Sequence, residues 1–227
     1  MIIDKRSVVG ADFSASLVAE PCKDIKGEFA GILRSKGILS ENGRIHIVPC
    51  AAELGRFIVN HKLDILLETQ ILSVARADKG FEVTIFNRDG MQKIFAKNVI
   101  NTENILGEGA LRTLGAVLVN GTSSLSVPDE LGYIQYERNE SEPIFHLKLD
   151  EKDDMVTARE KMRLVIDGGN RFGDWQIAAV ASEIAWHYDH VVRMITDDGM
   201  LNVLSASFGN IISAMEGGTH DAISNNN

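Results

Sequence analysis

The sequence predicts an α/β protein in which an antiparallel β-meander stands where a crossover helix is usual. Two short apolar runs, 63–68 and 98–102, are typical of strands buried on both faces. Between them lie three strand-like segments, 69–77, 80–87 and 91–96, separated by turn residues. We therefore expect the two runs to be neighbouring buried parallel strands bridged by the meander, with no helix between them.

Composition excludes several classes of function. The 227 residues are 44% hydrophobic and 24% charged, which is ordinary for a globular protein. The formal net charge of −9 argues against a nucleic-acid partner. No stretch approaches the roughly 20 apolar residues that span a bilayer, and no secretory signal is visible, so we expect a cytoplasmic protein without a membrane partner. Cys22 and Cys50 are expected to be reduced thiols, with a redox-active pair as the alternative.

The N-terminal third predicts two helices around a short strand. Residues 28–35 are expected to form a helix that ends at Gly37. The alternation at 44–48 predicts a strand. Pro49 suits the first turn of a second helix, whose apolar spacing continues to His61.

The second half is richer in strands. We expect a short helix at 110–114, strands at 132–138 and 143–149, and a helix at 155–166. Residues 175–188 fit either a helix or a strand. Near the C-terminus, residues 205–210 read as a turn and 210–216 as a helix that Gly217 and Gly218 stop.

The segment Ala96-Lys97-Asn98-Val99-Ile100-Asn101-Thr102 is similar to a strand ending of a known family. It resembles the A-K-x-V-I-x-A-T-G ending in FAD-dependent oxidoreductases with the glutathione-reductase type of flavin domain, where a meander also replaces one crossover. The match ends at Glu103, which stands where that family usually has glycine close to the flavin nucleotide.

The resemblance implies a fold and its domains. It implies an incomplete FAD-binding Rossmann-like domain with a β-meander crossover, plus a small β-rich inserted domain. Residues 1–110 and 195–218 would form the flavin-type domain, 111–194 the inserted substrate-type domain, and 219–227 a flexible tail. It also favours the strand over the helix at 175–188.

The resemblance further implies cofactor-binding residues. Asp4 stands where the family places the acid that bonds ribose hydroxyls, and Thr102 ends the fifth strand. A helix N-terminus favours negative charge, as forms on the flavin ring during reduction. The remaining expected contacts lie in the turn before the last helix: Ser207, Phe208, Gly209 and Asn210. A plain surface acid at Asp4 and an ordinary terminal helix are the alternatives.

The glycine turn that binds pyrophosphate in this family, G-x-G-x-x-G, should precede Asp4, but only three residues do. One hypothesis is therefore a subunit or portion of an FAD-dependent oxidoreductase that transfers hydride between a small organic substrate and flavin. The alternative is a cofactor-free, non-catalytic partner subunit that keeps the flavoprotein fold. A third possibility is that the sequence starts at an internal methionine. In each case we expect a partner protein or a missing N-terminal segment to complete the sheet.

No catalytic residue can be assigned from the sequence. It shows no Ser-His-Asp order, no P-loop and no metal-ligand spacing. His187 and His190 flank Tyr188 and Asp189, a cluster that could bind a metal or transfer protons. In a strand the two histidines would point to opposite faces, so no metal is expected.

Overall fold

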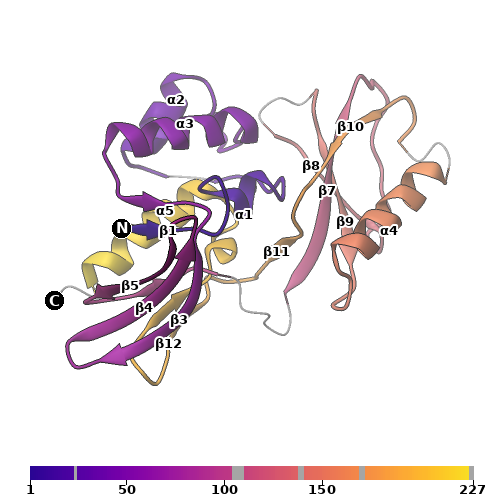
Figure 1. Cartoon of the computed structure of the whole chain (residues 1–227). Coiled ribbons are helices and arrows are strands. Elements are labelled where there is room, and N and C mark those ends of the chain that lie inside the picture. The colour runs from indigo at the N-terminus through magenta and orange to yellow at the C-terminus, as the bar shows by residue number, and fades with distance from the viewer. Residues whose placement is uncertain (23–24, 104–109, 138–140, 169–171, 225–227) are drawn as a thin grey trace.

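The computed structural model describes residues 1–22, 25–103, 110–137, 141–168 and 172–224, with 219–224 described by their backbone alone. These residues form two adjoining units, which lie left and right in Figure 1. The first unit comprises residues 1–103 and 193–224, and the second comprises 111–187. The helices are α1 (Ala11–Ser14), α2 (Glu28–Ser35), α3 (Ile47–Asn60), α4 (Met155–Asp167), the 3₁₀ turn η1 (Ser205–Phe208) and α5 (Ile211–Ser224).

The first unit holds three small sheets. Strand β1 (Ile2–Ile3) pairs in parallel with β2 (Ile65–Leu66). Strand β6 (Ile100–Asn101) pairs in parallel with β13 (Leu201–Val203), whose other neighbour is the antiparallel β12 (Arg193–Ile195). The third sheet is the antiparallel meander β3 (Gln70–Ala77), β4 (Gly80–Asn87) and β5 (Gly90–Ala96).

The meander is confirmed, and no helix interrupts residues 69–96, all of which are described. The expected pairing of the two flanking strands is wrong: β2 pairs with β1, and β6 pairs with β13. They are also not fully buried, since Leu63 and Leu67 beside β2 are 44% and 39% exposed. An apolar run shows that its side chains favour burial, but it does not show which strand its backbone pairs with.

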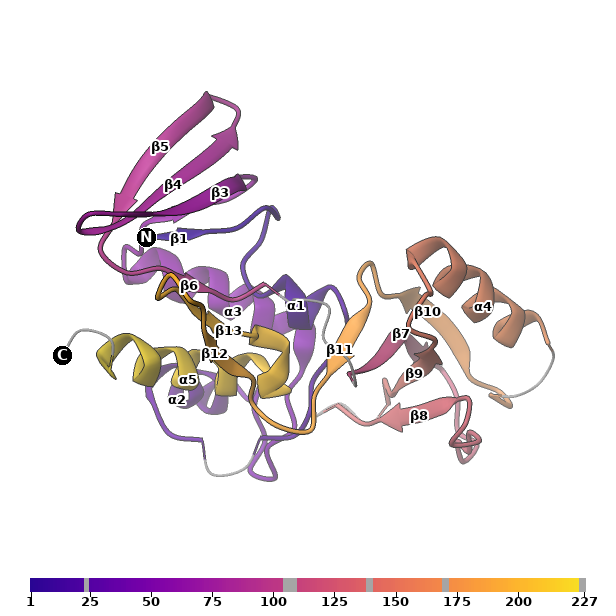
Figure 2. The same ribbon diagram turned by 90° about the horizontal axis from the view of Figure 1, so that it is seen from below.

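The meander packs against both of the other sheets, which contain the parallel pairs β1–β2 and β6–β13. The inward face of β4 is buried through Phe81, Val83 and Ile85. The partly buried residues packed against this face come from both sheets and their flanks, and include Ile3, Leu66, Val99 and Met200. Figures 1 and 2 show the meander on one side of β1, with α2 and α3 on the other.

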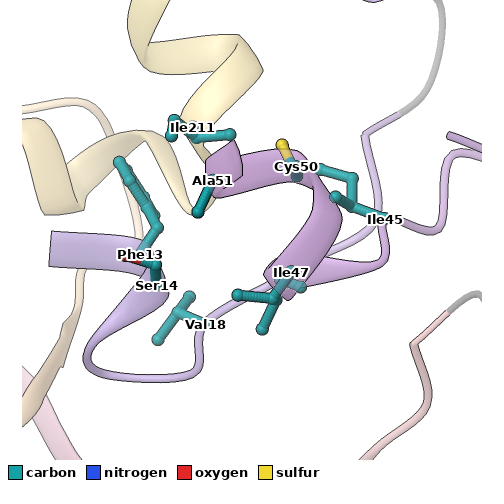
Figure 3. A pocket seen from close by; sticks show the side chains of 9 residues that line it. Phe13, Ser14, Val18, Ile45, Ile47, Cys50, Ala51 and Ile211 are labelled. Carbon is teal, nitrogen blue, oxygen red and sulfur yellow. The ribbon is translucent and has the colours of Figure 1, made fainter. Parts of the chain in front are cut away.

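The helices α1, α2, α3 and α5 share one apolar core. Figure 3 shows a void between α1, α3 and α5, lined by Phe13, Cys50 and Ile211 among others. Its volume of about 10 Å³ suits a single water at most, so it is a packing defect and not a ligand site. Cys22 and Cys50 belong to this core as free cysteines, and burial raises their pKa values to about 11 and about 12.

Two boundaries of this helical layer differ from expectation. The strand expected at 44–48 is wrong, because only an isolated bridge joins Leu39 and Ile45 before α3 begins at Ile47. The C-terminal helix does not stop at Gly217 and Gly218, since α5 continues to Ser224. Residues 219–224, assigned to the tail from the sequence, therefore belong to this helix, and 225–227 lie outside the described residues.

The second unit is a five-stranded sheet covered by α4. Its strands are β7 (Leu111–Val119), β8 (Gly132–Gln135), β9 (Ile144–Leu149), β10 (Gln176–Val180) and β11 (Ala185–His187). The order is β10-β7-β9-β8, and β11 also pairs with β7. The helix expected at 110–114 is wrong because β7 begins there, whereas the strands favoured within 175–188 are confirmed. The expected domain boundary after residue 194 falls inside β12, which lies in the first unit.

Polar and apolar contacts join the two units. Leu17 packs against the helical core and also against the core of the second unit. Glu137, just after β8, is only 6% exposed and accepts a hydrogen bond from the Ile47 amide at the start of α3 (3.4 Å). Within the described ranges, no helix is long and apolar enough to cross a membrane.

Removing a buried side chain of β4 should destabilise the first unit. Ile85 is fully buried under the meander, so Ile85→Ala is expected to lower the free energy of unfolding by about 2–5 kcal/mol. Phe95→Ala is the matched control, because Phe95 is 72% exposed and its loss should cost about 1 kcal/mol or less. Urea unfolding followed by circular dichroism measures both. Equal losses would contradict the packing described for β4.

The Glu137 contact between the units predicts a pH dependence. Burial raises the pKa of Glu137 from its ordinary value of 4.5 to about 7, with Glu142 adding to this and the Ile47 amide opposing it. Between those pH values the folded state binds more protons than the unfolded state, so the free energy of unfolding should fall as pH rises. Glu137→Gln should flatten this slope, whereas Glu151→Gln, at an exposed position, should leave it unchanged. Denaturant titrations across this pH window would show whether the two variants differ.

Candidate functional site

A cleft of about 530 Å³ opens between β1 and β6. Ile3 and Ile100 line it from the two strands, and Ile71 and Val74 line it from the meander. Glu183, Ile184 and Trp186 of the second unit form a further wall. Cavities of this size accommodate small-molecule ligands, and in open α/β sheets such ligands lie beyond the carboxyl ends of parallel strands.

The strands β1 and β6 face the cleft with unpaired edges. Lys5, just beyond β1, forms an ion pair with Glu103, just beyond β6, at 2.9 Å, so the carboxyl ends of both strands lie together. The amides of Ile2 and Asp4 donate to the β2 side, so the Ile3 amide between them points to the opposite side. Among the described strands, none pairs with β1 or β6 across this gap.

Asp4 and Thr102, two of the residues expected to bind cofactor, both line this cleft. One carboxylate oxygen of Asp4 accepts a hydrogen bond from the Arg6 amide at 2.9 Å, which fixes the side chain at the end of β1. Thr102 contributes its backbone carbonyl, which accepts from the Ser205 amide and hydroxyl at 3.3 and 3.2 Å. The structure thus brings the carboxyl ends of β1 and β6 together at one edge of the cleft, which we call the rim.

Arg6 is the cation around which acidic side chains gather at this rim. Its guanidinium forms ion pairs with Asp12 at 2.6 Å and with Glu183 of the second unit at 2.8 Å. Burial opposes the charge, but the two carboxylates outweigh it and raise the pKa of Arg6. Asp12 also contacts the Ser205 hydroxyl, so this network links β1, α1, η1 and the second unit. Sequence reasoning missed Arg6, Asp12 and Glu183, because they come from separated segments without a motif.

The rim suits a ribose better than a pyrophosphate. Asp4 offers a carboxylate that can accept from ribose hydroxyls. Four acids lie around the cleft, at positions Asp4, Asp12, Glu103 and Glu183, against the two bases Lys5 and Arg6. Glu103 is 64% exposed and paired with Lys5. A dianionic pyrophosphate would meet an excess of negative charge there, and proteins of this type usually offset it with backbone amides of a glycine turn.

The other four expected cofactor residues do not line this cleft. The Ser207 hydroxyl donates to the Leu204 carbonyl at 2.6 Å and accepts from the Val192 amide at 3.0 Å. Asn210 caps α5 by accepting from the Ser213 amide at 2.9 Å. Gly209 adopts a left-handed conformation (φ 72°), and its carbonyl accepts from the Glu20 amide at 3.3 Å. Phe208 stacks under Arg193, with the guanidinium 5.6 Å from the ring centroid. The side chains and carbonyl of this turn are thus engaged in contacts away from the cleft.

The histidine cluster at 187–190 is not arranged as a metal site. Among the described residues, no group of three or more His, Cys, Asp and Glu side chains could hold a metal ion. His187 instead points to the second unit's sheet and to Glu20.

Comparison with known proteins shows the fold. No family model matches the sequence, and no curated protein matches it. Solved structures do match. A geranylgeranyl bacteriochlorophyll reductase-like protein from Thermoplasma acidophilum has a TM-score of 0.57 and 13% identity, covering 99% of this chain and 79% of that one. BexE, studied for oxidation during BE-7585A biosynthesis, has a TM-score of 0.52 and 14% identity, covering 93% of this chain and 53% of that one.

A third match is aklavinone-11 hydroxylase in complex with FAD and aklavinone, with a TM-score of 0.49 and 11% identity. It covers 78% of this chain and 39% of the hydroxylase, so the chain spans less than half of that protein. Similarity at this level of identity concerns the fold. The chain has a mixed α/β fold similar to the folds of the reductase-like protein and of BexE.

The turn and α5 give a matched pair of glycine substitutions. A Cβ at Gly217 would overlap the Phe208 ring, whereas a Cβ at Gly218 would meet no atom within 4 Å. Gly217→Ala should therefore lower the free energy of unfolding by about 1–3 kcal/mol through overpacking. Gly218→Ala should raise it by about 0.5–1 kcal/mol, because alanine loses less backbone entropy in a helix. Thermal unfolding of both variants measures the difference, and equal effects would contradict the packing of α5 on η1.

Proposed function

We propose that this chain is a subunit or portion of an FAD-dependent oxidoreductase that transfers hydride between flavin and a small organic substrate. The observation that supports this most is the cleft between β1 and β6, with Asp4 and Thr102 at its rim. It lies at the carboxyl ends of parallel strands, where α/β sheets bind nucleotides. The fold likeness to a reductase-like protein and to BexE agrees with this proposal.

The residues of the rim have distinct roles in this proposal. The free carboxylate oxygen of Asp4 would accept from ribose hydroxyls, while its other oxygen stays fixed by the Arg6 amide. Arg6 would keep Asp12 and Glu183 neutralised and so limit repulsion of the phosphates. The flavin itself would supply the hydride chemistry, with the protein orienting it.

A further strand is needed for a complete site. β1 and β6 each leave an edge unpaired beside the cleft among the described strands, and their carboxyl ends lie together, so one extended segment between them would satisfy both with backbone hydrogen bonds. A glycine-rich turn after that strand would place backbone amides over the pyrophosphate and offset the acids of the rim. We propose that a partner polypeptide or a preceding segment provides this strand.

The acid excess at the rim supports a second candidate function. The same cleft, completed by a partner's strand, would join two subunits without holding a cofactor. The internal use of Ser207 and Asn210, away from the cleft, agrees with this non-catalytic role. The two candidates differ in whether the completed assembly binds FAD.

Binding of FAD to the isolated chain should be weak. Without amides over the pyrophosphate, residues 1–227 alone are expected to bind FAD with a dissociation constant above about 0.1 mM. Calorimetry and flavin fluorescence measure this. Fusing an apolar strand, a G-x-G-x-x-G turn and a helix before Met1 should tighten binding about 100-fold and cover the β1 edge.

The matched control is the same fusion with its three glycines changed to valine. That control keeps the strand but blocks close approach of the phosphates, so it should protect the Ile3 amide from hydrogen exchange without binding FAD. Tight stoichiometric FAD binding by the unfused chain would refute the incomplete site. Protection without FAD binding in both fusions would favour the non-catalytic subunit.

A further inference from the structure

A network of polar side chains links the two units away from the nucleotide cleft. Thr113 of β7, which is fully buried, lies at its centre. Its hydroxyl oxygen is 3.2 Å from Nδ1 of His146 and 2.9 Å from Nε2 of His187. The Tyr133 hydroxyl is 3.3 Å from the same His187 nitrogen. On the other side of the imidazole, Nδ1 of His187 is 3.2 Å from the Glu20 carboxylate.

The donors and acceptors of this network fix the proton positions. An ionised carboxylate only accepts, so His187 Nδ1 carries the proton that goes to Glu20 and Nε2 is the acceptor. Thr113 therefore donates to His187 Nε2, and its oxygen accepts from His146 Nδ1, while the Tyr133 hydroxyl also lies within reach of His187 Nε2. His146 is fully buried, and burial lowers its pKa to about 3, so it stays neutral and holds Thr113 in this orientation.

The network opens onto a cavity of about 250 Å³. Glu20 and Tyr133 both line this cavity, and His187 bridges them from behind. Gln135 also lines it, is 7% exposed, and has neither amide atom hydrogen-bonded within the described residues. A buried amide without partners is costly, and a bound polar group would satisfy it.

The cavity adjoins the turn that the sequence associates with flavin. The Glu20 amide donates to the Gly209 carbonyl at 3.3 Å, directly before α5. The two ends of the network therefore differ: Glu20 is 49% exposed beside this turn, whereas His187 is 10% exposed behind it. The imidazole of His187, which can accept a proton, therefore lies behind the cavity wall, and the carboxylate of Glu20 lies toward solvent.

We propose that this cavity binds a small neutral alcohol or ketone and that Tyr133 and His187 exchange a proton with its oxygen. In the oxidation direction, the ligand's O–H bond breaks and its proton passes to the Tyr133 oxygen. The phenol proton of Tyr133 passes at the same time to His187 Nε2. The resulting imidazolium is stabilised by the Glu20 carboxylate. The flavin of the proposed function would supply the hydride chemistry, accepting the ligand's hydride in this direction and returning it in the reduction direction. Gln135 hydrogen-bonds the ligand's oxygen.

The site rests on the proposed function only for the hydride, so its test needs no flavin. The probes are cyclohexanol and cyclohexanone, titrated into residues 1–227 with isotope-labelled histidine and followed by NMR. Saturable shifts of the His187 signals are expected, with millimolar affinity. Tyr133→Phe should weaken binding about 3- to 10-fold, the effect of one hydrogen bond. Tyr136→Phe is the control, because Tyr136 lines the same cavity outside the network, and it should change affinity less than about 2-fold.

A second readout tests the role of Glu20. In the neutral imidazole, the proton of His187 should lie on Nδ1, toward Glu20. Glu20→Gln should shift the proton toward Nε2, because an amide can donate to Nδ1, whereas Asp189→Asn should not. Absence of saturable shifts, equal effects of the two tyrosine variants, or an Nε2 tautomer in the unmodified chain would overturn the proposal. If the probes bind as expected but no completed assembly binds FAD, the proposed function fails and the proton site stands.

Discussion

The first unit depends on the apolar contact between the β4 face and the two small parallel sheets. No described strand bridges β1 and β6, so backbone hydrogen bonds do not join these sheets. Phe81, Val83 and Ile85 instead pack against side chains from both, including Ile3 and Val99. Apolar packing is not directional, unlike backbone hydrogen bonding. The meander can therefore hold the two sheets in one unit although the edges of β1 and β6 do not pair with each other. The meander packs against both sheets, but no described strand lies between β1 and β6, and this space is the cleft.

The junction between the units rests on charged and polar contacts as well as packing. Arg6 reaches Glu183, Glu137 reaches the start of α3, and Glu20 reaches His187. These contacts place both cavities at the boundary of the two units. Ligand sites commonly form at such boundaries, because neither core has to open to make room for a ligand. The cleft between β1 and β6 and the smaller cavity lie at different parts of the same boundary. Trp186 lines the cleft, while His187, the next residue of β11, contacts Glu20 and Tyr133 in the wall of the smaller cavity.

Adjacent residues of β11 explain this division. Successive side chains of a strand point to opposite faces, so Trp186 and His187 cannot serve the same cavity. This alternation leaves His187 to face Thr113 of β7, while Arg112 stacks on Trp186 on the other face, with the guanidinium 4.7 Å from the ring centroid. One short strand therefore contributes side chains to the walls of both cavities.

The sequence by itself determined the meander, the helices over 28–35 and 155–166, and the place of Asp4 and Thr102 at strand ends, because periodicity, capping and turn residues act locally. Asp154 accepts from the Thr157 amide at the start of α4, as such local signals predict. Only the tertiary structure decided which strands pair, that β1 and β6 stay apart, and that α5 passes through two glycines. It also decided that Ser207 and Asn210 serve the turn, and that Thr113, Tyr133, His146, His187 and Glu20 meet. Those contacts join residues far apart in the chain, and their partners are set by how the two cores pack, which no local pattern encodes.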